Sequence, residues 1–213
     1  MTDLPCFALA ATVWTYWICV GAMMVRLRHR TRKLSGIVPS QRIEQVMWLV
    51  WVPLVAAWMV LPYLAATRAH GPWMLPPFAR EASVTALRWA AVAVGVAALA
   101  LSIDCWLRMG SNWRMAVTPE QQTALVTSGL YSRVRHPIYA LSILLMLCTL
   151  VVAPTLPVAS IAAIHVALMI AKARNEERFL TERHGESYRR YVRRTGRFVP
   201  RPGGGGAGRG PSP

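Results

Sequence analysis

Apolar residues occur in five long runs that are separated by polar and mostly basic segments. A helix needs about 20 apolar residues to cross a bilayer, and the first three runs reach that length while the last two are shorter. The pattern predicts an all-α integral membrane bundle of about five transmembrane helices. The five runs are Leu4–Val25, Val46–Ala66, Val84–Leu107, Ile138–Ala153 and Pro157–Ala171. Since Pro154-Thr155-Leu156 alone separates the last two, they are expected to form an antiparallel hairpin.

The distribution of Lys and Arg predicts how these helices are oriented. The chain is 54% hydrophobic yet carries a formal charge of +15, which fits a membrane protein with basic loops. The segments 26–42, 68–88, 108–135 and 172–213 hold six, three, four and eleven Lys and Arg residues. With five spans, the three richer segments lie on one side, so we expect the N-terminus outside and the C-terminus in the cytoplasm. This arrangement accounts for the basic charge without a nucleic acid partner.

Two clusters of polar residues stand at the ends of the predicted hairpin. Arg135-His136-Pro137-Ile138-Tyr139 opens its first helix, and Glu176-Glu177 follows its second. Pro137 suits the first turn of a helix, whose free N–H groups can bind an anion, while a glutamate can bind an ammonium. The pair of clusters therefore indicates a ligand that carries both charges. Taken alone, the first cluster is better explained as a helix start with interfacial anchors.

Other polar residues have simpler explanations. Asp104 is expected to form an i,i+4 ion pair with Arg108, and His165 to be a packed neutral imidazole. Leu125 and Val126 indicate a loop that dips back to line a pocket or only to pack. From Glu176 onward, apolar and basic residues predict a cytosolic amphipathic helix lying on anionic membrane lipids. The four cysteines lie in apolar runs, so no metal site is predicted; they are Cys6, Cys19, Cys105 and Cys148.

Several motifs in the second half of the chain occur together in an order that is quite specific. This combination resembles the isoprenylcysteine carboxyl methyltransferase family and its prokaryotic relatives, over about Leu107 to Pro200. The motifs are Gly110 to Trp113, Leu125-Val126-Thr127-Ser128-Gly129-Leu130-Tyr131, Arg135-His136-Pro137-Ile138-Tyr139, Glu176-Glu177-Arg178-Phe179-Leu180, Gly185 with Tyr188 and Tyr191, and Arg197-Phe198-Val199-Pro200. One departure is Leu141, which stands where the family usually has a glycine and could narrow the pocket.

The resemblance implies an integral membrane enzyme that uses S-adenosyl-L-methionine and admits a lipophilic or lipid-linked acceptor from the bilayer. It implies that Glu176 binds the cofactor's ammonium and that Lys172 or Arg174 orients an anionic acceptor. The cofactor-binding residues it implies are Thr123, Ala124, Leu125, Val126, Tyr131, His136, Pro137, Ile138, Tyr139 and Glu176. The acceptor is an isoprenylcysteine-type carboxylate or, alternatively, a phospholipid amine or small thiol.

On this basis we expect three parts: membrane helices in 1–107, a catalytic region in 108–200, and a disordered Gly- and Pro-rich tail in 201–213. Two other functions remain open. A membrane reductase that uses NADPH would have a related arrangement of C-terminal helices. A non-enzymatic scaffold would explain the basic tail, but not the adjacent Glu176 and Glu177.

Overall fold

The computed structural model describes residues 3–31, 39, 41–68, 70–110, 113–115 and 125–202. The helices in these ranges are α1 (Leu4–Thr31), α2 (Arg42–Thr67), α3 (Ala82–Met109), α4 (Pro137–Val152) and α5 (Leu156–Arg194). Two short 3-10 helices, η1 (Pro77–Arg80) and η3 (Gly129–Ser132), precede α3 and α4 respectively. Each predicted apolar run thus corresponds to one helix, although the fourth run ends one residue after α4, at Ala153. Helices α1, α2 and α5 extend well beyond their runs at one end, and α3 by two residues at each end.

The helices have the length and composition of membrane spans. Within the described ranges, α1, α2, α3 and α5 are long and apolar enough to cross a bilayer, and α4 is a shorter apolar helix of 16 residues. Large apolar side chains such as Ile18, Leu49 and Leu101 are exposed, as expected for surfaces that face lipid. The predicted helical membrane bundle is therefore confirmed.

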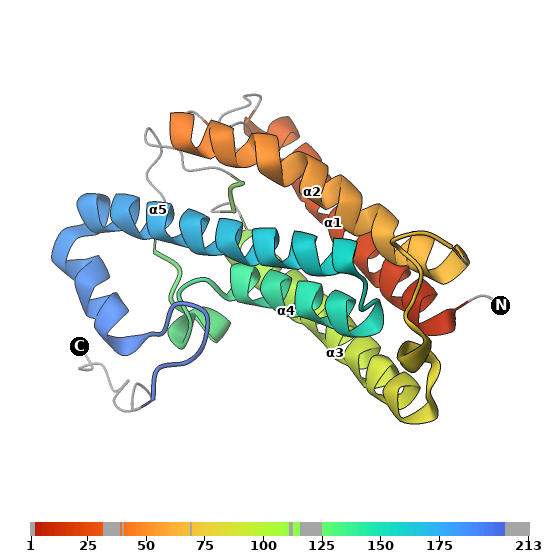
Figure 1. The fold of residues 1–213 in the computed structure, drawn as a ribbon. Helices are drawn as coiled ribbons and strands as arrows, with labels where there is room; N and C mark the ends of the chain where they lie inside the picture. The colour runs from red at the N-terminus through yellow and green to blue at the C-terminus, as the bar shows by residue number, and fades with distance from the viewer. Residues whose placement is uncertain are drawn as a thin grey trace.

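Helix α5 lies between α2 and α4, while α3 packs along α4 and α1 along α2 (Figure 1). The chain alternates direction from helix to helix, so α1 and α3 end where α2 and α4 begin. The basic residues that flank these helix ends, among them Arg28, Arg30 and Arg42, consequently gather at one end of the bundle. This grouping matches the pattern expected for the cytoplasmic side, although the orientation itself stays a prediction.

A buried arginine ties the helices together at the opposite end of the bundle. Arg88 is 1% exposed, and its Nη2 lies 2.5 Å from Asp3 Oδ1. It also donates to the carbonyl oxygens of Val152 at 2.7 Å and Ala79 at 3.0 Å. Because these partners belong to the start of α1, the end of α4 and η1, the guanidinium holds together segments far apart in sequence. Its charge is thereby compensated, as a buried charge requires.

The last helix differs from the prediction in one respect. We expected the amphipathic stretch from Glu176 to be an element separate from the last span, but α5 continues through Glu176 without a break. No glycine or proline stands between Ala171 and Glu176 to end the helix. The direction changes at Gly185, whose φ of 52° is a left-handed value that glycine tolerates, and the rest of α5 folds back toward η3 (Figure 1).

Candidate active site

A cavity of about 260 Å³ lies at the end of the bundle where α4 begins. Its volume is close to the lower limit of small-molecule pockets, about 300 Å³. Two of its surfaces differ in chemistry. We call the first the polar wall, formed by Arg135, His136, Tyr139, Lys172 and Glu176. The second, the aromatic wall, is formed by Tyr16, Trp17, Trp48, Trp51, Trp106 and Trp113.

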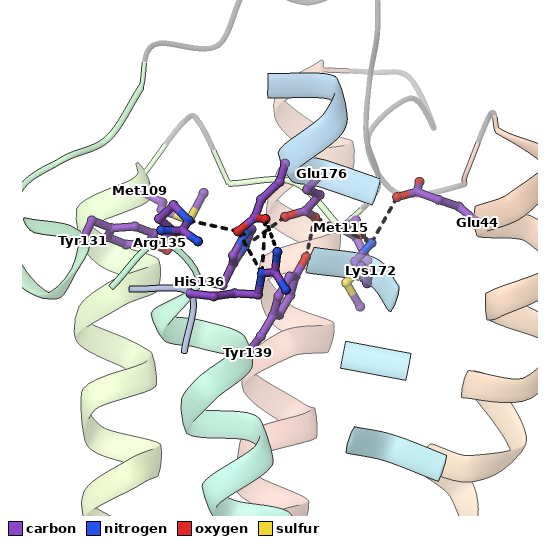
Figure 2. A network of polar contacts seen from close by, with 11 residues as sticks. Glu44, Met109, Met115, Tyr131, Arg135, His136, Tyr139, Lys172 and Glu176 are labelled. Atoms are coloured by element: carbon purple, nitrogen blue, oxygen red, sulfur yellow. Dashed lines mark hydrogen bonds and ion pairs between the residues drawn. The ribbon is translucent and has the colours of Figure 1, made fainter. Parts of the chain in front are cut away.

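Glu176 is the centre of the polar wall (Figure 2). The Tyr139 hydroxyl donates a hydrogen bond to Glu176 Oε1, and Lys172 Nζ lies 3.8 Å from the same oxygen. The other oxygen, Oε2, lies 3.5 Å from His136 Nδ1. These partners come from the first turn of α4 and from one turn earlier on α5, so the helical hairpin itself brings them together.

His136 lies between two carboxylates. Its Nε2 is 3.4 Å from Glu177 Oε1, and its ring stacks on that of Tyr139 with centroids 5.4 Å apart and planes 5° apart. Burial disfavours the charged imidazole, but Glu176 and Glu177 outweigh that effect and raise the pKa of His136 above its ordinary value. A proton on this ring therefore helps to hold the two acidic side chains together.

Glu177 faces away from the cavity and fastens the C-terminal segment. Arg135 Nε donates to Glu177 Oε1 at 2.9 Å, and Arg197 Nη2 donates to Glu177 Oε2 at 2.6 Å. Backbone bonds run alongside, from the N–H of Arg135 to the carbonyl of Gly196 at 2.8 Å and from the N–H of Gly196 to the carbonyl of Arg133 at 3.0 Å. We call this pairing of 195–197 with 133–136 the C-terminal clasp.

The clasp also limits what can replace Gly196. A Cβ at this position would lie 1.7 Å from the carbonyl oxygen of Val199, which is far inside contact distance. Tyr191 reinforces the clasp, since its hydroxyl donates to the carbonyl oxygen of Tyr131 at 2.6 Å. Residues 191–197 are thus packed against the segment that leads into α4.

Most residues that the sequence indicated as cofactor-binding lie on the cavity: Leu125, Val126, Tyr131, His136, Ile138, Tyr139 and Glu176. Pro137 begins α4 and is buried beneath that surface. Thr123 and Ala124 lie outside the described residues. Leu141 does not enter the cavity, because it packs with Ala98, Cys105 and Tyr131. Of the two residues considered for the acceptor, Lys172 lines the cavity, whereas Arg174 is exposed and does not.

Sequence reasoning missed Glu44 and the aromatic wall. Glu44 is 1% exposed, lines the cavity, and has its Oε1 3.4 Å from Lys172 Nζ. It stands in the first turn of α2, where the sequence shows only an acidic residue beside a basic loop. Glu44, Trp48 and Trp51 are spaced so that they share one face of a helix, which could have indicated that this face is used. The spacing does not indicate which other helix this face packs against.

The two simpler interpretations of polar residues hold. Asp104 and Arg108 form the expected i,i+4 ion pair, with Oδ2 and Nε 2.6 Å apart. His165 is fully buried, with Nε2 3.0 Å from Ser142 Oγ and its ring centroid 5.0 Å from that of Trp58. It is therefore a packed imidazole behind the cavity, since it is absent from the cavity's lining.

Fold and site together define a helical membrane bundle with a cavity at one end that has a polar wall and an aromatic wall. Residues 91–182 match the model of the isoprenylcysteine carboxyl methyltransferase (ICMT) family. The family that the motifs resemble is thus also the one whose model matches this part of the chain. It is also 29% identical over 173 residues to "Cobalt-zinc-cadmium resistance protein CzcN" of Cupriavidus metallidurans, which covers 80% of this chain and 69% of that protein.

Proposed function

We propose that the protein transfers a methyl group from S-adenosyl-L-methionine to a lipophilic acceptor that reaches the cavity from the membrane. The observation that carries this proposal is the polar wall, where the Glu176 carboxylate and the first turn of α4 face one cavity. The first turn of a helix leaves its amide N–H groups without partners in the helix, here those of Ile138 and Tyr139. A ligand with an ammonium and a carboxylate on one carbon is suited to that pair of groups.

Other residues that line the cavity fit such a cofactor as well. Tyr188 is buried on the cavity, and its hydroxyl has no hydrogen-bond partner among the described residues. A ligand with ribose and purine groups offers that hydroxyl a partner. Leu125, Val126 and Tyr131 supply the apolar and aromatic surface on which a purine ring packs. The residues that line the cavity therefore fit both the amino acid part and the nucleoside part of S-adenosyl-L-methionine.

The chain's own contribution to the reaction is positioning and exclusion of water. The cofactor, when bound, supplies a methyl group that is already activated, so no covalent intermediate on the protein is needed. Glu176 and the start of α4 would orient the donor, and the folded-back end of α5, with Tyr188 and Tyr191, covers one side of the cavity. Holding two reactants in line accounts for a large part of such a barrier, about 7–11 kcal/mol in well-oriented systems.

The aromatic wall supports a lipophilic acceptor. It is built by α1, α2 and the end of α3, whose outer faces carry exposed apolar side chains. An acceptor with a long apolar tail can therefore bring its reactive group to the cavity while the tail remains among apolar residues. An isoprenylcysteine-type carboxylate fits this description, as do a phospholipid amine and a small lipophilic thiol.

The first experiment measures thermal stability of the detergent-purified protein with S-adenosyl-L-methionine, S-adenosylhomocysteine or NADPH. A ligand that binds the native state adds to the free energy of unfolding by mass action, about 2.7 kcal/mol at a hundredfold excess over Kd, and so raises Tm. We expect both adenosyl ligands, and not NADPH, to raise Tm. A shift with NADPH alone would support the reductase instead, and no shift with any ligand would support the scaffold.

A substitution tests the role of Glu176. Glu176→Gln should weaken S-adenosyl-L-methionine binding about tenfold to a hundredfold, since a charge-assisted hydrogen bond contributes about 1.5–3 kcal/mol. The matched control is Glu182→Gln, which makes the same change at an exposed position of α5. Isothermal titration of both variants gives the comparison. If Glu176→Gln binds the cofactor as the wild type does, the proposed role of Glu176 is wrong.

A further inference from the structure

The polar wall contains a cation that is already neutralised, and this bears on the acceptor. Lys172 Nζ lies 3.4 Å from Glu44 Oε1 and 3.8 Å from Glu176 Oε1, and it donates to the carbonyl oxygen of Met115 at 2.9 Å. Figure 2 shows the lysine between the two carboxylates, with Glu44 approaching from α2. Lys172 therefore brings no net positive charge to its surroundings, and an anionic acceptor would meet Glu44 beside it.

Glu44 is placed to meet an acceptor rather than the cofactor. It comes from α2, on the opposite side of Lys172 from Glu176 and the start of α4. Its side chain is 1% exposed and lines the cavity. A buried carboxylate is costly unless it is paired, so a paired carboxylate on a cavity wall is a candidate for function. Hydrogen bonding of Asn175 to Gln41 at 2.8 Å fixes the start of α2 against α5 and so keeps Glu44 in place.

Indole rings continue from Glu44 along the same cavity. Trp48 and Trp51 follow it by one and two turns of α2, and Trp17 of α1 meets Trp51 with centroids 5.2 Å apart. The centroids of Trp48 and Trp51 are 5.8 Å apart, so the three rings form one surface. The face of an indole carries negative potential that attracts ammonium groups. The faces of these rings therefore suit a cation better than a carboxylate.

Resting on the proposed methyl transfer, we propose that the acceptor is a lipophilic amine, and that Glu44 binds its ammonium and takes its proton. An amine reaches the site protonated and must lose a proton before it can attack. The proton moves from the ammonium nitrogen to the Glu44 carboxylate. The freed lone pair forms the new N–C bond to the methyl carbon while the C–S bond breaks and its electrons remain on sulfur. The product is a methylated ammonium, and Glu44 returns its proton to solvent.

Acceptors that differ only in their head group test this class. The full chain in detergent is given S-adenosyl-L-methionine with dodecylamine, dodecanoate or dodecanethiol, and S-adenosylhomocysteine formation is measured. We expect dodecylamine to be methylated at least tenfold faster than the other two. Faster turnover of dodecanoate or dodecanethiol would overturn the amine proposal and leave the methyltransferase proposal standing. Absence of any thermal shift with the cofactor would instead count against the methyltransferase proposal itself.

A variant tests Glu44 separately. Glu44→Gln should lower turnover of dodecylamine about a hundredfold, which is the low end of the effect expected when a general base is lost. The thermal shift with S-adenosyl-L-methionine should remain. Glu182→Gln is again the control and should match the wild type. Glu44→Gln with unchanged amine turnover would overturn the role of Glu44. Should Glu44→Gln fail to fold, Trp48→Leu provides the second variant: its KM for dodecylamine should rise severalfold, and an unchanged KM would overturn the cation-binding surface.

Discussion

Glu176 and Glu177 are neighbours in sequence, yet they belong to two regions with different tasks. Glu176 faces the cavity and is bound by Tyr139, His136 and Lys172. Glu177 faces the clasp and is bound by Arg135 and Arg197. Adjacent helical residues point about 100° apart, so one acidic pair can serve both regions. The comparison teaches that two adjacent acidic residues need not belong to one site. The Glu176 carboxylate faces the cavity, where a ligand can reach it, whereas the Glu177 carboxylate is used in ion pairs that hold the clasp together.

The strongest test of this division removes the clasp's carboxylate. Glu177→Ala leaves Arg135, whose side chain is 10% exposed, and Arg197, whose side chain is 35% exposed, without their acidic partner. Removing one partner of a fully buried ion pair costs about 3–5 kcal/mol, and this partly exposed cluster should lose somewhat less. We expect a marked fall in Tm of the ligand-free protein, whereas Glu176→Gln should change that Tm little and affect cofactor binding. Equal loss of ligand-free stability in the two variants would refute the separation of tasks.

A second test adds one methyl group to the clasp. Gly196→Ala forces the Val199 carbonyl away from the new Cβ, at a cost of about 1–3 kcal/mol typical of overpacking. Differential scanning calorimetry should show a lower Tm than that of the wild type, with a smaller change than for Glu177→Ala. The matched control is Gly21→Ala, because a Cβ at Gly21 meets nothing within 4 Å. If Gly196→Ala and Gly21→Ala have the same Tm, close packing of the clasp at Gly196 does not contribute to the stability of the protein.

The smallest effect concerns His136, which joins the two regions. Its pKa in the folded protein is raised by Glu176 and Glu177, so its proton stabilises the fold. That contribution is complete below the ordinary histidine pKa of about 6.5 and is lost as pH rises through the raised pKa. As pH rises from about 6.5 through the raised pKa of His136, Tm of the wild type should therefore decline more than Tm of the His136→Gln variant. Parallel pH profiles would show that the imidazole charge contributes nothing.

Much of the fold could be predicted from hydrophobic runs, because each membrane helix must be apolar over most of its length. The Pro154-Thr155-Leu156 break predicted the hairpin, and the hairpin predicted that His136 and Tyr139 meet Glu176. What could not be predicted was the far side of the cavity. Glu44 lies 128 positions before Lys172 in the chain, and no local pattern indicates that their side chains meet.

Which residues of the hairpin face the cavity also depended on the side of the helix from which they project, and not on residue type. Lys172 and Arg174 are equally basic, and two positions on a helix point to nearly opposite sides. Only the packing of α5 between α2 and α4 decides that Lys172 faces the cavity and Arg174 does not. The amphipathic stretch behaved similarly: Phe179, Leu180, Tyr188 and Tyr191, expected to face lipid, line the cavity. The two tyrosines reach it because α5 turns back at Gly185.

The sequence by itself determined a helical membrane protein, its hairpin, and the polar cluster that resembles a methyltransferase site. These features depend on composition and short spacing, and such information is local to the chain. Tertiary structure alone decided that Glu177 and the C-terminal residues form a clasp, and that Glu44 and the tryptophans of α1 and α2 complete the cavity. Contacts of this kind arise when distant helices pack side by side, since their direction and rotation set which side chains meet.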